Sequence, residues 1–333
     1  MKNYFKFNLT GKQVLPVWIY FMVLFLVPYA FVQFKLQGFQ HAQSQDPHEV
    51  MARLGMMMQW YGVMFLLLLV QYSILFFLAK LSIEAVEFKE KEFSFAGKFG
   101  QFLGVLIPNF LLCIITLGIY SPWFITKMIT FFAQKSSNDS NNFEFKGKGG
   151  DLFLIVLFTL IIPMMVMTTI VMIFAFRAMF QGSATPGSSP FPYAFLLMMS
   201  AIFILFIPYF YYVYKWMVNF KYKNYAIQWE TSFWNASAKI ALEIFLSIVT
   251  LGIYLPLASL KLYQYFAERT IATSETTRKR FGYDLESKDD FLLIWGQALL
   301  VIITLGIYYP WAYCKITSRI LEKSYSQQIA TVE

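Results

Sequence analysis

The chain has 333 residues, of which 58% are apolar, 20% aromatic and only 14% charged. This balance excludes an ordinary water-soluble domain, in which about a quarter of the residues are charged. The formal net charge is +8. In a membrane protein, the distribution of the excess lysine and arginine residues indicates which loops face the cytoplasm. We therefore expect an integral membrane protein that binds no nucleic acid.

Seven long apolar runs dominate the sequence. They cover residues 15–34, 56–79, 102–132, 152–176, 191–214, 240–266 and 291–314. A bilayer core requires about 20 apolar residues in a helix, so each run predicts membrane-embedded helix. No small-residue cleavage site follows the first run, so we expect a retained span instead of a signal peptide. Cys113 and Cys314 lie inside such runs, and we expect buried thiols with no disulfide, metal or cofactor.

Five pairs of large apolar residues precede these runs, and the members of each pair are separated by one residue. The pairs are Phe5/Phe7, Phe93/Phe95, Phe143/Phe145, Ile227/Trp229 and Phe281/Tyr283. In extended backbone both members of a pair point to the same side. We predict short interfacial strands whose rings dip toward the lipid headgroups, an environment that aromatic residues favour.

The first outer loop contains His41, Asp46, His48 and Glu49. These side chains could bind a divalent metal, but their spacing matches no standard site, and a solvated loop is the simpler interpretation. A glycine-rich stretch at residues 143–151 lacks the spacing and the terminal Lys-Ser/Thr of a P-loop. A tight turn into a helix is therefore favoured there.

The pentapeptide Thr-Leu-Gly-Ile-Tyr occurs three times, which marks an internal repeat. It covers residues 116–120, 250–254 and 304–308, and each copy is followed two positions later by proline. Glycine and proline both disturb regular helix geometry, so each of these runs should break here. Residues 99–134 as one helix would measure about 54 Å, which is too long for one straight span.

Charge counts separate two topologies, in which each motif run either crosses once or turns at the pentapeptide and returns. With hairpins and a cytoplasmic N-terminus, 21 of the 27 lysines and arginines face the cytoplasm, whereas single crossings give no bias. The positive-inside rule favours the hairpins. The basic segment Arg278–Arg280 would then lie at the anionic inner leaflet, with membrane lipids as partners.

The predicted fold is an all-α polytopic membrane protein with about ten membrane-crossing or re-entrant helices, several of them broken at the pentapeptide. Both termini are expected in the cytoplasm. One integral membrane domain, residues 1–333, would contain five hairpins at residues 5–83, 93–135, 143–215, 227–268 and 281–325.

A polar residue lies seven positions before each repeated threonine, and a lysine lies seven positions after each repeated tyrosine. Seven residues are two helical turns, so each polar residue shares a helix face with its threonine, and the three hairpins would share one polar stripe. The candidate substrate- or ion-binding residues are Asn109, Thr116, Lys127, Glu243, Thr250, Lys261, Gln297, Thr304 and Lys315. Glu243 is the one acidic residue deep in an apolar run, where it could carry a proton or pair with a lysine.

Structural interpretations of the same residues stay open. Asn, Gln and Thr side chains also hold membrane helices together, at about 0.6 kcal/mol per contact, and the lysines could snorkel to the surface. The Gly-Ile-Tyr-x-Pro turn is similar to the broken helices that form transporter sites. Its tyrosines, with Trp123 and Trp311, could equally form an interfacial aromatic belt.

The order of these motifs resembles a known family. A phenylalanine pair with a following glycine, a helix containing Asn109, the Thr-Leu-Gly-Ile-Tyr-x-Pro-Trp motif and a second phenylalanine pair resemble the YjgN family of bacterial inner-membrane proteins. Residues 93–149 match best, and residues 281–315 match the helix and the turn. The resemblance implies an inner-membrane location and a domain of unknown function, and it brings no activity or catalytic residues.

Two functions are compatible with these features. The first is a transporter or channel for a small solute or lipid, because repeated broken helices carry a polar stripe with one buried carboxylate. The second is a non-catalytic membrane scaffold or assembly partner whose basic inner loops bind lipids or proteins. We expect no enzyme, since the sequence has no H-E-x-x-H motif and no histidine in any membrane run.

Overall fold

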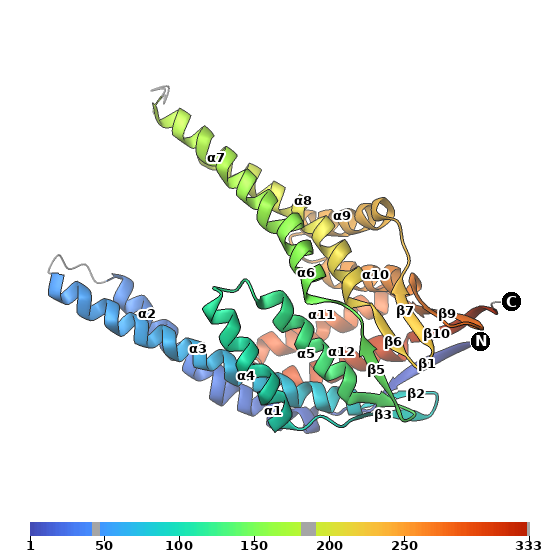
Figure 1. Cartoon of the computed structure of the whole chain (residues 1–333). Coiled ribbons are helices and arrows are strands. Elements are labelled where there is room, and N and C mark those ends of the chain that lie inside the picture. The colour runs from blue at the N-terminus through green and yellow to red at the C-terminus, as the bar shows by residue number, and fades with distance from the viewer. Residues whose placement is uncertain (42–46, 181–190, 332–333) are drawn as a thin grey trace.

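Ten short strands close into one antiparallel barrel in the computed structural model, which describes residues 1–41, 47–180 and 191–331. The strands follow one another around the barrel in sequence order, and β1 closes the ring by pairing with both β2 and β10. Figure 1 shows that both ends of the chain lie at the barrel end of the molecule. The strands are β1 (Lys2–Phe7), β2 (Val86–Phe88), β3 (Lys91–Phe95), β4 (Ser136–Asn138), β5 (Asn141–Phe145), β6 (Phe220–Tyr222), β7 (Tyr225–Trp229), β8 (Thr270–Thr273), β9 (Thr277–Tyr283) and β10 (Ser324–Thr331).

Helices connect β1 to β2, β3 to β4, β5 to β6, β7 to β8 and β9 to β10, while short turns make the other connections. Because neighbouring strands are antiparallel, this alternation places all the helical connections at one end of the barrel. Two π-helical segments, η1 (Met22–Leu26) and η2 (Leu157–Ile161), join α1 to α2 and α6 to α7. The α-helices are α1 (Gly11–Phe21), α2 (Val27–His41), α3 (Pro47–Glu84), α4 (Phe99–Ile115), α5 (Ser121–Lys135), α6 (Gly149–Val156), α7 (Ile162–Phe180), α8 (Phe191–Met217), α9 (Phe233–Val249), α10 (Leu255–Glu268), α11 (Ser287–Ile303) and α12 (Tyr309–Glu322).

The barrel shows that the all-α prediction is wrong. The five apolar pairs lie in β1, β3, β5, β7 and β9, and each of these strands is paired on both sides. Their partners include β2, β4, β6 and β8, which contain three or four residues and had not been predicted. A strand edge presents unpaired N–H and C=O groups, and closure into a barrel gives every strand two neighbours.

The apolar pairs point into the barrel. Phe93 in β3 and Phe143 in β5 are separated by β4, so their backbones lie about 10 Å apart in a flat sheet. Their rings nevertheless stack with centroids 5.6 Å apart, which requires the sheet to curve toward them. The alternate side chains, including Lys6, Glu92 and Glu144, are exposed on the outer face. The predicted position of the rings, dipping toward lipid headgroups, is therefore also wrong.

Three helical segments of the described residues are long and apolar enough to cross a membrane, namely Gly11–Gln37, His48–Glu84 and Gly149–Phe174. This number corrects the expectation of about ten. The helices that flank the pentapeptides contain 14 to 17 residues. At 1.5 Å per residue they measure about 21–26 Å, less than a bilayer core of about 30 Å. We call α4–α5, α9–α10 and α11–α12 the three short hairpins.

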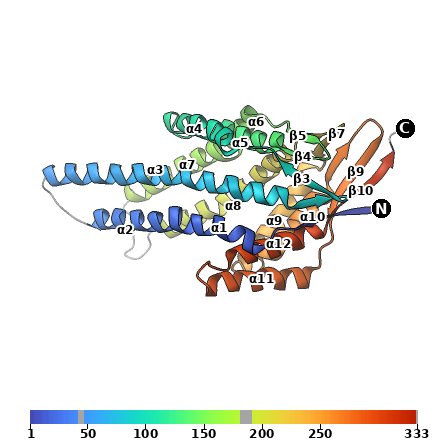
Figure 2. The same cartoon turned by 90° about the horizontal axis from the view of Figure 1, so that it is seen from below.

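Two longer helix pairs extend beyond the short hairpins. In Figure 1, α2 and α3 leave the barrel end in one direction, whereas α7 and α8 leave it in another. Figure 2 shows the same molecule from below, with α1 and α2 running beside α3. The helical part of the molecule is therefore not one parallel bundle.

Aromatic packing joins the helices to the barrel. Phe95, the last residue of β3, packs against Phe76 of α3 and Phe132 of α5, with ring centroids 5.8 Å away in both cases. Phe102 of α4 is completely buried in the same cluster. Full burial of a large apolar side chain contributes about 1.5–3 kcal/mol, so this cluster stabilises the position of α4–α5.

Ion pairs join neighbouring turns at the far end of the barrel. Asp139, between β4 and β5, pairs with Lys91 of β3 and with Lys223 in the turn after β6. Hydrogen bonds from Lys223 and Lys91 lower the pKa of Asp139 to about 2. This carboxylate therefore stays ionised at physiological pH and links three neighbouring parts of the barrel.

A buried carboxylate ties the last short hairpin to the barrel. Asp290 in α11 is 1% exposed and accepts hydrogen bonds from Arg319 Nε and Lys323 Nζ, both at 2.8 Å. Tyr283 of β9 donates to its other oxygen at 3.1 Å. Burial opposes ionisation of Asp290, but the hydrogen bonds from Lys323 and Arg319 outweigh it and lower the pKa of this carboxyl.

Replacing Asp290 with asparagine should destabilise the protein by about 1.5–3 kcal/mol, because Arg319 and Lys323 lose a buried charged acceptor and keep only the exposed Glu286. Unfolding by heat or denaturant in detergent measures the loss. The adjacent Asp289 is exposed, so Asp289→Asn is a matched control that should change stability by less than about 0.5 kcal/mol. Equal stability of the two variants would contradict a structural role for Asp290.

Candidate functional site

The three pentapeptide turns share one backbone geometry. In the first copy Thr116 ends α4, and the next two residues adopt positive φ, 51° at Leu117 and 88° at Gly118. The Gly118 N–H donates to the Cys113 carbonyl at 2.7 Å, which satisfies a free carbonyl at the helix end. The same φ values recur within 2° in the other two copies. Glycine is the residue that adopts this conformation at least cost.

The threonine hydroxyls belong to these turns. Thr116 Oγ1 donates to the Leu112 carbonyl at 2.7 Å and accepts from the Tyr120 N–H at 3.0 Å. Thr250 and Thr304 make the corresponding bonds at 2.7–3.1 Å. Each hydroxyl thus ends one helix and positions the start of the next.

The polar residues that precede the threonines lie in three separate hairpins. Helix α4 packs mainly on α3 and α5, α9 on α8 and α10, and α11 on α10 and α12. In the first hairpin Asn109 is buried, donates to the Val105 carbonyl at 2.6 Å and accepts from Tyr120 Oη at 2.9 Å. The polar residue is therefore paired with the tyrosine of its own turn.

The second short hairpin breaks this pattern. Glu243 occupies the position of Asn109 and is 1% exposed, and Lys239 donates to its Oε1 at 2.6 Å. Among the described residues, Glu243 Oε2 and the buried Tyr254 Oη have no hydrogen-bond partner. Lys261 Nζ lies 5.4 Å from the Tyr254 ring centroid, where its main polar neighbour is the Tyr254 hydroxyl, and it has a weaker electrostatic interaction with Glu243.

These four residues, Lys239, Glu243, Tyr254 and Lys261, form what we call the α9–α10 cluster. Buried polar atoms in proteins usually have partners, so the two unpartnered oxygens of this cluster indicate a place for a proton, an ion or a ligand group. A carboxylate between two lysines can exchange one ionic partner for another. Sequence reasoning had selected Glu243, Thr250 and Lys261 but had missed Lys239, which lies one turn before Glu243.

The third short hairpin has a different arrangement. Gln297 is half-buried, and its Oε1 has no hydrogen-bond partner in the part of the chain that the structure describes. Lys315 Nζ donates to Tyr308 Oη at 3.0 Å. In the first short hairpin the corresponding Lys127 is exposed on α5. The motif lysines therefore have three different environments despite their common spacing.

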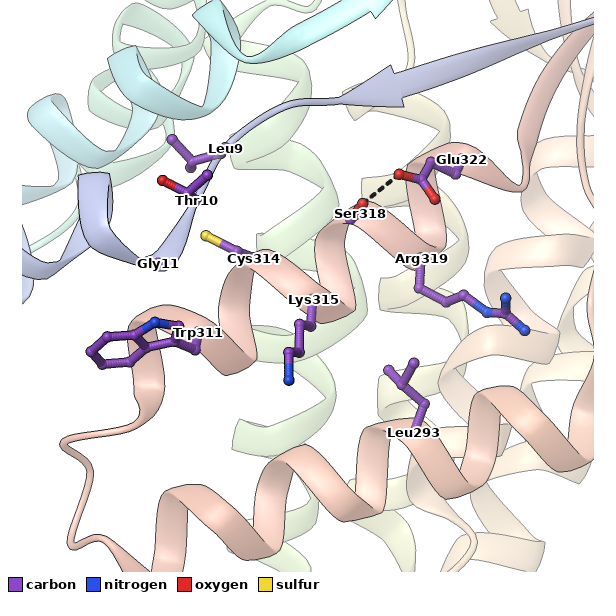
Figure 3. A pocket seen from close by; sticks show the side chains of 10 residues that line it. All are labelled: Leu9, Thr10, Gly11, Leu293, Trp311, Cys314, Lys315, Ser318, Arg319 and Glu322. Atoms are coloured by element: carbon purple, nitrogen blue, oxygen red, sulfur yellow. Dashed lines mark hydrogen bonds between the residues drawn. The ribbon is translucent and has the colours of Figure 1, made fainter.

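A pocket of about 400 Å³ lies beside Lys315, between α11, α12 and the segment that leads into α1 (Figure 3). Lys315, Arg319 and Leu293 contribute to its wall, and Figure 3 shows Ser318 bonded to Glu322, at 2.6 Å. Arg319 is already paired with Asp290, so the pocket does not concentrate positive charge. We regard it as a weaker candidate than the α9–α10 cluster.

Tryptophans tie two of the turns to neighbouring hairpins. Trp295 Nε1 of α11 donates to the Ile253 carbonyl at 2.9 Å, and Trp18 Nε1 of α1 donates to the Gly306 carbonyl at 3.0 Å. Sequence reasoning missed both contacts. Their signal was an indole N–H inside an apolar run, where a donor needs an acceptor.

The basic segment predicted at the inner leaflet forms part of β9. Arg278 pairs with Glu230, Lys279 Nζ lies 3.9 Å from the centroid of the Tyr225 ring, and Arg280 is exposed on the outer face. Strand alternation thus separates three charges that adjoin in sequence.

No group of three or more potential metal ligands occurs among the described residues. Asp46, the His41 side chain and the second outer loop, residues 181–190, lie outside those residues.

The chain belongs to a family of bacterial proteins of unknown function, DUF898, which matches residues 90–271 and hence more than half of the sequence. The chain is also similar to "Inner membrane protein YjgN" of Salmonella typhimurium strain LT2, with 40% identity over 68 residues. That similarity covers 20% of this chain and 17% of the relative. Together these matches confirm the resemblance to the YjgN family. No solved structure matches the chain.

Two tyrosine variants test the difference between the first and second short hairpins. Tyr120→Phe should destabilise the protein by about 0.5–1.5 kcal/mol, because Asn109 loses the bond to Tyr120 Oη. Tyr254→Phe removes a hydroxyl that has no partner among the described residues, so stability should stay unchanged or rise. Unfolding midpoints of both variants in one detergent provide the measurement, and a larger loss for Tyr254→Phe would contradict the assignment.

Proposed function

We propose that the protein is an inner-membrane transporter or channel for a small solute or lipid, without enzymatic activity, and that the α9–α10 cluster is its working site. The observation that carries the proposal is the buried Glu243, with one oxygen bound by Lys239 and the other unpartnered among the described residues. Ionisable residues inside membrane segments are costly and mark ion or solute pathways more often than packing contacts.

The position of the cluster supports this role. The turn that follows α9 exposes Leu251 at 93% and Ile253 at 61%, and the other two turns expose Leu117 at 93% and Leu305 at 86%. Large exposed apolar surfaces suit lipid better than water. The short hairpins are thus suited to enter the bilayer without crossing it, which places Glu243 and Lys261 in a medium of low dielectric constant.

The chemistry of the cluster also supports transport. Protonation of Glu243 would remove its attraction for Lys239 and free an ammonium group for an anionic solute. Deprotonation would restore the original pair and expel that solute. Proton binding at Glu243 and anion binding at Lys239 would thus each change the affinity of the other. Coupled transport requires such a linkage between two binding sites.

Flux through purified protein in proteoliposomes tests the proposal. Internal pyranine reports proton movement when amino acids, carboxylates or sugars are added outside, and dithionite reduction of NBD-phosphatidylglycerol reports lipid movement. We expect one of these probes to move faster than in empty liposomes. Glu243→Gln and Lys261→Met should each reduce that rate at least tenfold, because either change removes a charge from the cluster.

Lys315→Met is the matched control, because Lys315 has the same motif position and also lies beside the tyrosine of its turn, but its hairpin has Gln297 in place of Glu243. Its flux should stay within twofold of the unmodified protein. Folded Glu243 and Lys261 variants with full flux, or no flux of any probe through the unmodified protein, would overturn transport.

We also propose that the barrel faces the cytoplasm, together with both ends of the chain. Figure 1 places these ends at the barrel. The strands and their turns contain many basic residues, and positive charge collects on the cytoplasmic side of inner-membrane proteins. The residues concerned are Lys2, Lys6, Lys89, Lys91, Lys221, Lys223, Arg278, Lys279 and Arg280.

A cysteine placed at Ser140, an exposed residue in the turn before β5, tests this orientation. With Cys113 and Cys314 replaced by alanine, a membrane-impermeant maleimide should label the new thiol in inverted vesicles and leave it unlabelled in intact spheroplasts. Leu117→Cys should resist the reagent in both preparations, because its turn lies in lipid. Labelling of Ser140→Cys in spheroplasts would reverse the proposed topology.

A membrane scaffold is the second candidate function. Arg280 is exposed on the outside of the barrel, where it could contact anionic lipid or a protein partner. A scaffold predicts a partner that is retained in mild detergent and lost when Arg278, Lys279 and Arg280 are neutralised.

A further inference from the structure

An indole fills the contact between two neighbouring hairpins at the start of α6. Trp123, the residue after the repeated proline at the start of α5, lies against Gly149, where a Cβ atom would come within 2.6 Å of the indole. Trp123 also packs against Phe153, with ring centroids 5.3 Å apart, and stacks on Tyr120. Gly149 therefore has no room for a side chain.

The same contact is repeated at the start of α1. A Cβ atom on Gly11 would again lie 2.6 Å from an indole, that of Trp311, which stacks on Tyr308. Both glycines lie four residues after the end of an inner apolar pair, Phe145 in one case and Phe7 in the other. The same glycine position is thus covered by a tryptophan indole at two places around the barrel.

The third equivalent contact, between α10 and α11, has no indole at this position. Leu257 replaces the tryptophan and Ser287 replaces the glycine. A groove of about 410 Å³ is present there, lined by Tyr254, Leu257, Ser287 and Phe291. These residues correspond by position to Tyr120, Trp123, Gly149 and Phe153. The groove therefore lies where the other two contacts hold a ring.

We propose that this groove binds one acyl chain of an anionic phospholipid, with the phosphate near Lys288. Pockets of about 300–1,000 Å³ with apolar walls bind small apolar ligands, and the groove falls in this range. Its lining extends to Ile253 in the pentapeptide turn, beside the exposed Leu251, so it opens where acyl chains are available.

The charge at the groove supports an anionic headgroup. Lys288 is the only charged residue among the described residues that line the groove, and it is exposed. An ammonium group on a flexible stem binds phosphate as a point charge. The occupant therefore combines an apolar chain with a phosphate, which free phosphate alone does not provide. This site does not require that the protein transports anything.

Native mass spectrometry of the full chain in detergent tests the proposal, with dioleoyl phosphatidylglycerol and dioleoyl phosphatidylethanolamine as probes. The unmodified protein should retain one phosphatidylglycerol more tightly than the others. The double variant Leu257→Trp/Ser287→Gly, which restores both the indole and the facing glycine of the other contacts, should weaken that binding at least tenfold. Lys288→Gln should reduce the preference for phosphatidylglycerol over phosphatidylethanolamine, and inorganic phosphate should not displace the lipid.

Leu251→Trp is the matched control, because it makes the same leucine-to-tryptophan change in the same hairpin at a side chain that is 93% exposed. It should leave the tight phosphatidylglycerol in place. If this double variant does not fold, Leu257→Phe provides a smaller filling with the same expected direction. A folded groove variant that keeps the lipid with unmodified affinity would overturn the site, and displacement by inorganic phosphate would overturn the role of the acyl chain.

Discussion

The pairing of β1 with β10 is the constraint on which the rest of the molecule depends. Each strand of the barrel is only three to eight residues long, so few of them would persist without two neighbours. Closure gives each strand both neighbours and fixes the order of the helical connections around the ring. The helices then take their positions from strand ends, through rings such as Phe95 and through ion pairs such as Asp290 with Lys323.

The barrel end and the helical end use polar groups differently. Around the barrel, charges such as Asp139 and Lys223 are exposed and paired across neighbouring turns. In the short hairpins the polar side chains range from buried to exposed, and several serve the local turn, as Thr116 and Asn109 do. The α9–α10 cluster departs from both patterns, because Glu243 Oε2 and Tyr254 Oη are buried oxygens that lack hydrogen-bond partners among the described residues.

Part of the fold could be predicted from the sequence, and particular residues explain the rest. The alternation of Phe93 and Phe95 predicted extended backbone, and β3 forms there. Its partner β4 is Ser136–Asn138, three polar residues that continue directly from α5 and show no apolar alternation. Because strand pairing is a long-range property, neither the partner nor the closed ring has a local sequence signal. The apolar runs were read as crossings, whereas α4 and α5 are too short to cross.

Part of the α9–α10 cluster could also be predicted from the sequence. A buried acidic residue in an apolar run identified Glu243, and the repeat identified Lys261. Lys239 does not belong to the repeat, and only the helix geometry shows that it reaches the Glu243 carboxylate. The expectation of one stripe shared by three hairpins assumed that the helices meet, and their packing partners keep them in separate pairs.

The place of β10 in the ring has a consequence for biosynthesis. A ribosome makes this strand after every described helix, so β1 and β9 each keep an open edge until residues 324–331 have been synthesised. During that interval the edges can pair with a second nascent chain. Residues 324–331 thus close the barrel. A chain released before they are made would have an open barrel with two unpaired strand edges, and proteases would act on it more readily.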